Sequence, residues 1–344
     1  MKKKFVCFLV VILIFSLLLS SCKTKEEPVI SKENYLLGTI VQLKVYGKNA
    51  ESASNKAMDI ISDIDNKMSP SKANSEISNI NKNAGKSFVK VSDDTFIVIK
   101  KALEYSKLSS GYFDITIGPL VNLWGIGTDK AIVPSVNEIN KKKSFINYND
   151  IILDDKSKSV KLKKVNESID LGGIAKGYTA DKVKECLLKE GIKTAFINLG
   201  GNIVTVGNKS DNSLWSIGIQ DPLKTRGEYF SVVKVSEKSI VSSGNYERFF
   251  IKDGKKYHHI LDPKTGYPSE NGLIATTIIS DKSIDGDAIS TSTYILGLEK
   301  GLKLVESLEG VEAIFVTSDK KVYITSGLKD SFNLTNKEYT YEER

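Results

Sequence analysis

The sequence predicts an α+β fold: a single interlocked unit of mixed sheets and helices. Two observations lead to this prediction. Helical and β-rich patterns alternate along the chain without the regular strand–helix–strand order of a parallel α/β protein. The 344 residues are 40% hydrophobic and 26% charged, which is the composition of a globular protein with a buried core. No Pro/Gly/Ser-rich linker divides the chain after its N-terminal region, so one unit is favoured, and two lobes are the alternative.

The N-terminal residues are typical of a bacterial export signal. Lys2-Lys3-Lys4 precede an apolar run of about 15 residues, which is short for a membrane-spanning helix. Leu19-Ser20-Ser21-Cys22 resembles a lipobox, in which the cysteine is lipidated and becomes the new N-terminus. A simple membrane anchor is the alternative. We therefore expect a signal peptide at residues 1–21, a lipidated tether at 22–33 and an extracytoplasmic protein anchored to the bacterial cell membrane.

Four elements are predicted in the first half of the catalytic domain. Residues 36–46 alternate apolar and polar side chains in part, as a half-buried strand does. Residues 53–68 place apolar side chains at helical spacing, and residues 93–108 form a second helical pattern capped by Ser92. Residues 151–165 contain two β-rich runs around a polar turn, which predicts a hairpin.

The second half of the domain is predicted in the same way. Residues 178–190 form a helical pattern that ends at Gly191. Further helices are expected at residues 287–296 and 298–309. Strands are expected at residues 194–198, 215–220, 229–235, 239–242, 311–316 and 321–325. We place the catalytic domain at residues 34–332, followed by a polar C-terminal tail at residues 333–344.

Charge and composition exclude several classes of function. The formal charge is +7, but without the three lysines of the signal 46 basic residues face 42 acidic ones. The remaining lysines are scattered among acids, so we expect no nucleic-acid partner. Three cysteines and two histidines argue against a disulfide scaffold and a His/Cys zinc cluster.

The segment Ser168–Tyr178 predicts an anion site. Asp170 is followed by Gly172 and Gly173, and Lys176 lies at the start of a helix. Amides at such a junction can bind a phosphate, and a lysine adds a mobile cation. A tight helix-entry turn would explain the glycines equally well. The paired glycines in the segment Asn198–Asn202 allow close approach of a ligand, although a simple turn explains them too.

Two further segments carry polar chemistry. Both histidines, His258 and His259, lie in a loop-rich stretch with Asp262, where a general base or phosphate contact is expected. Asp287 and Thr291 are four residues apart, so on a helix they share one face and form an oxygen half-site that suits Mg²⁺. An N-cap role for Asp287 is the alternative. Together the segments predict Mg²⁺-assisted phosphoryl or nucleotidyl chemistry.

These segments resemble the ApbE family of flavin transferases. The resemblance runs from Leu37 to about Gly297, and its most specific stretches begin at Asp170 and His259. It implies an enzyme that cleaves FAD, joins FMN through a phosphoester to a Thr or Ser of an acceptor protein with an FMN-binding domain, and releases AMP. The acceptor is typically extracytoplasmic, such as a subunit of an ion-pumping redox complex. An FAD pyrophosphatase and a non-catalytic flavin-binding lipoprotein remain alternatives.

The resemblance also implies roles for single residues. Asp287, Thr291 and the carbonyl of Gly173 would hold Mg²⁺, and His259 and Asp287 would be catalytic. The residues expected to line or shape the FAD site are Gly118, Asp170, Gly172, Gly173, Lys176, Gly200, Gly201, Asn202, Ser243, Gly244, His259 and Asp262. Family members often carry an aromatic residue after a Met-Ser pair, where this chain has Pro70-Ser71-Lys72.

Overall fold

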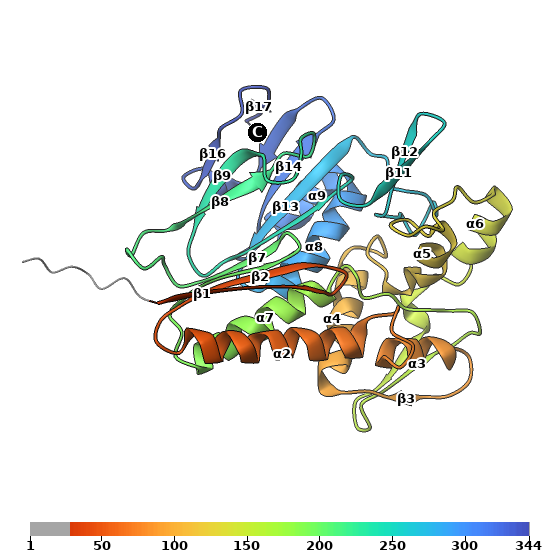
Figure 1. Ribbon diagram of the computed structural model, residues 1–344. Helices are drawn as coiled ribbons and strands as arrows, with labels where there is room; N and C mark the ends of the chain where they lie inside the picture. The colour runs from red at the N-terminus through yellow and green to blue at the C-terminus, as the bar shows by residue number, and fades with distance from the viewer. Residues whose placement is uncertain (1–27, 344) are drawn as a thin grey trace, which may run out of the picture.

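A computed structural model describes residues 28–343 of the chain. Within this range a large sheet lies between a layer of helices and a smaller sheet (Figure 1). The helices are α2 Ala50–Met68, α3 Glu76–Lys82, α4 Asp93–Leu108, α5 Gly118–Trp124, α6 Val136–Lys143, α7 Ala175–Lys189, α8 Ser283–Leu296 and α9 Leu298–Glu306. Short 3₁₀ turns lie at Ile115–Ile117, Tyr148–Asp150 and Ser326–Leu328.

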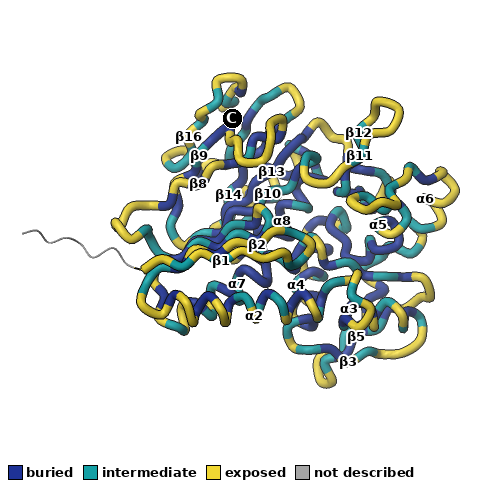
Figure 2. Tube along the Cα trace, viewed as in Figure 1, coloured by how far each residue is buried: buried dark blue, intermediate teal, exposed yellow. Residues whose placement is uncertain are grey.

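The large sheet has nine strands among the described residues, in the order β1-β2-β6-β7-β10-β13-β14-β15-β17. Their pairs are antiparallel except for β15 with β17. The strands are β1 Val29–Leu36, β2 Thr39–Tyr46, β6 Thr194–Leu199, β7 Asn202–Val206, β10 Ser239–Gly244, β13 Leu273–Ser280, β14 Glu312–Thr317, β15 Lys321–Ile324 and β17 Thr340–Tyr341. All eight residues of β13 are buried, so this strand lies at the centre of the molecule (Figure 2).

Helices α2, α7 and α8 cover one face of this sheet (Figure 1). Apolar residues of α2 and α7 pack against β2, β6 and β7 in one cluster, which includes Ile61 and Val183. This face of the sheet is shielded from solvent because each of these helices presents a stripe of small or branched apolar side chains to it. Helix α8 packs on β10 and β13, and α7 packs on α8.

A three-stranded sheet covers the opposite face. It consists of β8 Trp215–Gln220, β9 Tyr229–Val235 and β16 Phe332–Leu334, in the order β16-β9-β8. The inward side chains of β8 and β9 alternate with exposed ones and pack on β10, β13 and β14. Both faces of the central strands are therefore buried.

Two smaller sheets lie beside these layers. One consists of β3 Val89–Lys90, β5 Ser159–Leu162 and β4 Ile151–Asp154, and it packs near α3 and α4. The other is a hairpin of β11 Phe249–Lys252 and β12 Lys255–His258. Phe250 and Tyr257 of the hairpin pack in a separate cluster around Trp124 of α5.

The predicted α+β class is confirmed, and most predicted elements form, but several boundaries differ. Within the predicted strand at 36–46, Leu36 ends β1, Leu37 and Gly38 form a tight turn with positive φ, and residues 39–46 form β2. Residues 29–33, which we placed in the tether, belong to β1 because they pair with β2. The predicted polar tail is also paired in part: it contains β17, and Tyr339 is buried. The strands that were not predicted include β3, β7, β11, β12, β13, β16 and β17.

The predicted signal peptide and Cys22 lie outside the described residues. Among residues 28–343, no helix combines the length and the apolar character that crossing a membrane requires.

Candidate active site

The candidate site is built where α7 and α8 meet. Asp287 lies inside α8, so its N-cap alternative is wrong. One oxygen of its buried carboxylate, Oδ2, accepts a hydrogen bond from the amide of Gly177 at 2.9 Å. A Cβ at Gly177 would lie 2.3 Å from the carbonyl oxygen of Ser283, so only glycine allows this approach of the two helices. The backbone therefore fixes the carboxylate against the start of α7.

The three residues predicted to hold a metal lie near this contact. Thr291 lies one turn beyond Asp287 on α8, and a Cβ on Gly173 would lie 3.2 Å from its Oγ1. The hydroxyls of Ser290, Ser292 and Thr293 donate to carbonyls of their own helix. Within residues 28–343, no such bond is made by Thr291. Its oxygen and Oδ1 of Asp287 form a hard-oxygen donor pair, which fits Mg²⁺.

In the glycine turn before α7, several backbone amides already have hydrogen-bond acceptors within the protein. Oδ1 of Asp170 accepts the amide of Gly172 at 2.7 Å, which holds the turn. The amide of Ala175 donates to Leu171, and that of Gly177 donates to Asp287. The expectation that the amides of this turn are free for phosphate is therefore wrong for Gly172, Ala175 and Gly177. The ammonium of Lys176 lies at the same place: Nζ donates to the Gly172 carbonyl at 3.0 Å and forms an ion pair with Oδ1 of Asp287 at 3.7 Å.

The two histidines have different surroundings. His258 is 4% exposed, its Nε2 lies 3.0 Å from the carbonyl of Ser269, and its Nδ1 accepts the amide of Ile260. Both ring nitrogens are used, so His258 is structural. His259 is only partly buried overall, but its ring lies among cations. Burial, with the nearby charges of Arg248 and Lys176, lowers the pKa of His259 to about 3.

Arg248 was not predicted as a site residue, although the chain contains only three arginines. Its carbonyl accepts the amide of His259 at 3.0 Å. A Cβ on Gly38 or on Gly127 would lie 3.9 or 3.2 Å from its side chain. No carboxylate pairs with it among the described residues. A guanidinium without such a partner, beside a second cation, is typical of an anion site.

Several predicted FAD-site residues have clear structural roles. Gly118 and Gly244 allow close backbone approach, because a Cβ would lie 2.6 Å from the Ser168 carbonyl oxygen or 2.9 Å from that of Ile274. Gly200 and Gly201 both have positive φ and form the two-residue turn between β6 and β7.

The remaining predicted residues are polar. Asp262 caps its own turn by accepting the amide of Lys264. Ser243 bonds the hydroxyl of Ser290 on α8 at 2.8 Å, and so lies close to Asp287 in the fold. Oδ1 of buried Asn202 accepts the hydroxyl of Ser283, while its Nδ2 has no partner within the described residues. An orphaned buried donor such as this one is costly unless a ligand satisfies it.

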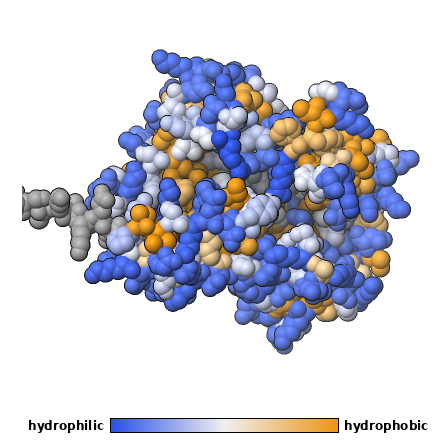
Figure 3. Space-filling model, viewed as in Figure 1, coloured by the Kyte–Doolittle hydropathy of each residue, from blue (hydrophilic) through white to orange (hydrophobic). Residues whose placement is uncertain are grey.

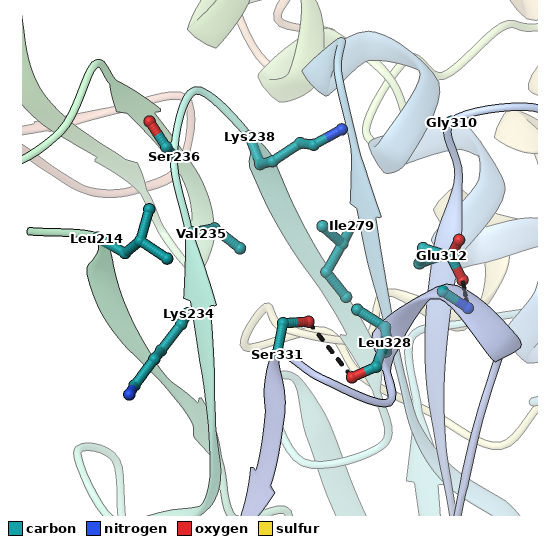
Figure 4. Close-up of a pocket in the computed structure, with 11 residues that line it drawn as sticks. Leu214, Lys234, Val235, Ser236, Lys238, Ile279, Gly310, Glu312, Leu328 and Ser331 are labelled. Atoms are coloured by element: carbon teal, nitrogen blue, oxygen red, sulfur yellow. Dashed lines mark hydrogen bonds between the residues drawn. The ribbon is translucent and has the colours of Figure 1, made fainter.

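A separate cavity of about 300 Å³ lies elsewhere in the molecule (Figure 4). It is bordered by β9, by Ile279 of β13 and by the segment around Leu328. Lys238, which also borders it, pairs with Asp281 at 2.5 Å. None of the predicted site residues lines it, so the site described above is distinct from this cavity.

Known proteins are similar to this chain over most of its length. A sequence model described as the ApbE family matches residues 37–315. The chain is 36% identical over 301 residues to the FAD:protein FMN transferase of Klebsiella pneumoniae, covering 88% of this chain and 93% of that protein. It is 31% identical over 329 residues to the corresponding Treponema pallidum protein, covering 91% of each.

Solved structures have the same fold. The ApbE protein of Thermotoga maritima superimposes with a TM-score of 0.82 at 30% identity, covering 88% of this chain and 99% of that one. The flavin transferase ApbE of Vibrio cholerae gives a TM-score of 0.80 at 25% identity, covering 89% and 99%.

Proposed function

The chain belongs to the ApbE family and is an FAD:protein FMN transferase, and we propose that it attaches FMN to an acceptor protein in a Mg²⁺-dependent reaction. In this reaction a Thr or Ser hydroxyl of the acceptor attacks the phosphorus on the FMN side of the FAD pyrophosphate. The new phosphoester forms as the bond to AMP breaks. The observation that carries the proposal is the convergence of Asp287, Thr291 and Gly173 beside Lys176.

The cations of the site support binding of the pyrophosphate. Lys176 and Arg248 approach His259 from two different parts of the chain, and both charges act on its ring. A diphosphate placed between them would be held by charge-assisted hydrogen bonds. Such fixed cations stabilise the negative charge that builds up as the bond breaks.

The oxygen donors support a metal at the same place. Asp287 and Thr291 would hold Mg²⁺, with the carbonyl of Gly173 as a further ligand. When bound, Mg²⁺ would supply positive charge to the phosphate oxygens of the leaving group. The Gly177 amide keeps the carboxylate oriented, so Oδ1 of Asp287 faces the site.

His259 is the proposed acceptor of the hydroxyl proton. Its low pKa keeps the ring neutral, so it has a lone pair free to receive a proton. Bound phosphates oppose the charges of Arg248 and Lys176, and they raise the pKa of His259 towards its ordinary value. Substrate binding would therefore make the ring a better base when the acceptor hydroxyl is present.

The cell location is part of the proposal. The lipobox-like sequence ending at Cys22 supports a lipoprotein anchored outside the cytoplasm. Its acceptors would then be extracytoplasmic proteins with an FMN-binding domain.

One assay tests the reaction. Purified protein is incubated with FAD, Mg²⁺ and a recombinant FMN-binding acceptor domain, and the acceptor is analysed by mass spectrometry. The expected result is a mass increase equal to one FMN minus water, matched by AMP release and abolished by EDTA. Free FMN without an adduct would instead indicate a pyrophosphatase, and labelling that survives EDTA would contradict the metal.

A further inference from the structure

An exposed apolar surface lies directly beside the site, on the β11–β12 hairpin. Phe249 is 42% exposed and Ile251 is 66% exposed. Hydrophobic side chains gather over this hairpin and the neighbouring α5 (Figure 3). The turn Asp253–Gly254 has positive φ at both residues, which gives a tight, well-defined hairpin rather than a loose loop.

The two faces of the hairpin differ in packing towards its tip, although His258, which pairs with Phe249, is buried at the base. Phe250 and Tyr257 face each other across the strands with ring centroids 5.3 Å apart, and Tyr257 lies 5.7 Å from Trp124 of α5. The opposite face carries Phe249 and Ile251, because side chains alternate along a strand. One face thus anchors the hairpin, while the other, beyond His258, offers the apolar side chains of Phe249 and Ile251 to solvent.

The open face also carries a cation without an acidic partner. Lys256 lies opposite Ile251, and its Nζ is 4.2 Å from the ring centroid of Phe249. Burial lowers the pKa of Lys256, and no carboxylate pairs with it among residues 28–343. The hairpin as a whole carries three lysines and one aspartate. A partner with acidic side chains would complement this charge.

The hairpin is continuous with the active site. Arg248 directly precedes β11, and His259 directly follows β12, so the two strands begin and end at site residues. The Arg248 carbonyl and the His259 amide are hydrogen-bonded at the base of the hairpin. A polypeptide lying along the open face would reach the reacting centre at one end.

We propose that the Phe249–Ile251–Lys256 face binds the acceptor protein, through an extended acidic segment with apolar side chains next to its acceptor Thr or Ser. The proposal rests on the transferase function proposed above. A membrane surface is disfavoured as the occupant. If Cys22 is lipidated, the seven positions to Val29 span at most about 25 Å. Val29 begins β1 on the side of the molecule opposite the hairpin (Figure 1).

The test compares Ile251→Ser and the double variant Phe249→Ser/Ile251→Ser with the wild-type full-length protein. Ile97→Ser on α4 is the matched control, because Ile97 is 50% exposed and lies on a different element. Initial rates of FMN transfer are measured against acceptor concentration. We expect KM for the acceptor to rise about tenfold or more in the double variant and to stay unchanged in the control. Lys256→Glu should shift KM in the same direction.

Four further readouts, together with adduct formation, separate the outcomes. FAD affinity and the melting temperature should be unchanged in the surface variants, since neither side chain is buried. A wild-type protein that forms no adduct would refute the transferase function itself. An adduct formed with unchanged KM in the double variant would refute the docking surface alone. The docking surface would also be refuted if the double variant lost only binding to phosphatidylglycerol vesicles, or only self-association in light scattering.

Discussion

At the residue scale, the Asp287 carboxylate combines two functions in one side chain. Oδ2 accepts the Gly177 amide at the start of α7, and Oδ1 faces Lys176 and the proposed metal position. An asparagine keeps an oxygen that can accept the amide but loses the negative charge. We therefore expect Asp287→Asn to retain the wild-type melting temperature and to lose transfer activity by about a hundredfold or more.

The Asp287→Ala variant provides the contrast. Alanine removes the negative charge and also leaves the Gly177 amide without a partner. We therefore expect the free energy of unfolding to fall by about 1–2 kcal/mol. Calorimetry and the FMN adduct assay measure the two effects separately. A metal role for Asp287 would be untenable if the asparagine variant labelled the acceptor at the wild-type rate.

His259 gives a second prediction at this scale. The chain has only two histidines, so an untagged sample should give two resolved imidazole signals in NMR. Both pKa values are lowered, and that of His259 to about 3. Its signal should therefore not titrate between pH 5 and 8 in the free protein. Adding FAD and Mg²⁺ should raise the pKa of His259 into a measurable range and leave His258 unchanged.

Sequence reasoning could propose Asp287, Thr291 and Lys176 for the candidate site, because each lies in a short local pattern with a chemical meaning. It could not identify Arg248 as a site residue, since its neighbours Gly38 and Gly127 are far away in sequence. The scarcity of arginine in this chain was the available signal. The family resemblance favoured His259 over His258, and the structure supplies a physical reason for the difference: both ring nitrogens of His258 are already hydrogen-bonded.

At the scale of elements, α7 and α8 cap each other. Asp287 of α8 accepts an amide at the start of α7, and Asp181 of α7 accepts the amides of Ser283 and Ile284 at the start of α8. Each helix start thus depends on a carboxylate from its partner. The two helices should therefore form and unfold together, with the site between them.

Asp181 makes this contact sensitive to pH. Burial raises its pKa to about 6, against an ordinary value of 3.8. Between these values the folded state keeps a proton that the unfolded state has lost, so the free energy of unfolding falls as pH rises from 4 to 6. At neutral pH the ionised, buried Asp181 lowers the free energy of unfolding by about 3 kcal/mol. Asp181→Asn has no such titration.

Urea unfolding at several pH values tests this. The stability of Asp181→Asn relative to the wild type should increase by up to about 3 kcal/mol between pH 4 and 7. The two histidines make the free energy of unfolding rise with pH, and because they do so equally in both proteins, the comparison cancels their contribution. A stability difference that does not change with pH would show that Asp181 is ionised normally.

The crossing of α7 and α8 also depends on the absence of a side chain at Gly177. An alanine there places Cβ 2.3 Å from the Ser283 carbonyl oxygen, so α7 and α8 must separate. We expect Gly177→Ala to lower the free energy of unfolding by about 2 kcal/mol or more and to reduce transfer. Glu185→Ala, at an exposed position of the same helix, is the matched control. Wild-type stability in Gly177→Ala would mean that the helices can part without cost.

The elements that the sequence predicted correctly are those with a clear period, such as α2, α4 and the strands β8 and β9. β13 was missed because all eight of its residues are buried, which removes the alternation by which a strand is recognised. The helices α3, α5 and α6 have only seven or eight residues, too few for a periodic signal. β1 was hidden by its exposed, polar sequence at the sheet edge.

At the scale of the whole molecule, the strand order is the feature that no local pattern contains. β2 pairs with β6, although about 150 residues separate them, and this pairing places the β1–β2 turn near Gly200. The site therefore draws on segments from Gly38 to Thr291. Segments far apart in the sequence therefore have to come together before the site can form.

The proposed anchor can be separated from catalysis at this scale. Every site residue lies between Gly38 and Thr291, and the first strand of the catalytic fold begins at Val29, seven positions after Cys22. We expect Cys22→Ser to abolish lipidation and release the protein from membranes. Its kcat with a soluble acceptor domain should remain within about twofold of wild type, since changes away from the site have small effects.

Fractionation and mass spectrometry of the intact chain check the first expectation, and the adduct assay in detergent checks the second. An anchored acceptor sharpens the comparison, because confining both proteins to one membrane raises their effective concentration. Cys22→Ser should then label an acceptor embedded in vesicles more slowly than the lipidated enzyme does, while a soluble acceptor shows no difference. If Cys22→Ser and the lipidated enzyme labelled the embedded acceptor at equal rates, the anchor would only localise the enzyme and would not help it to meet its acceptor.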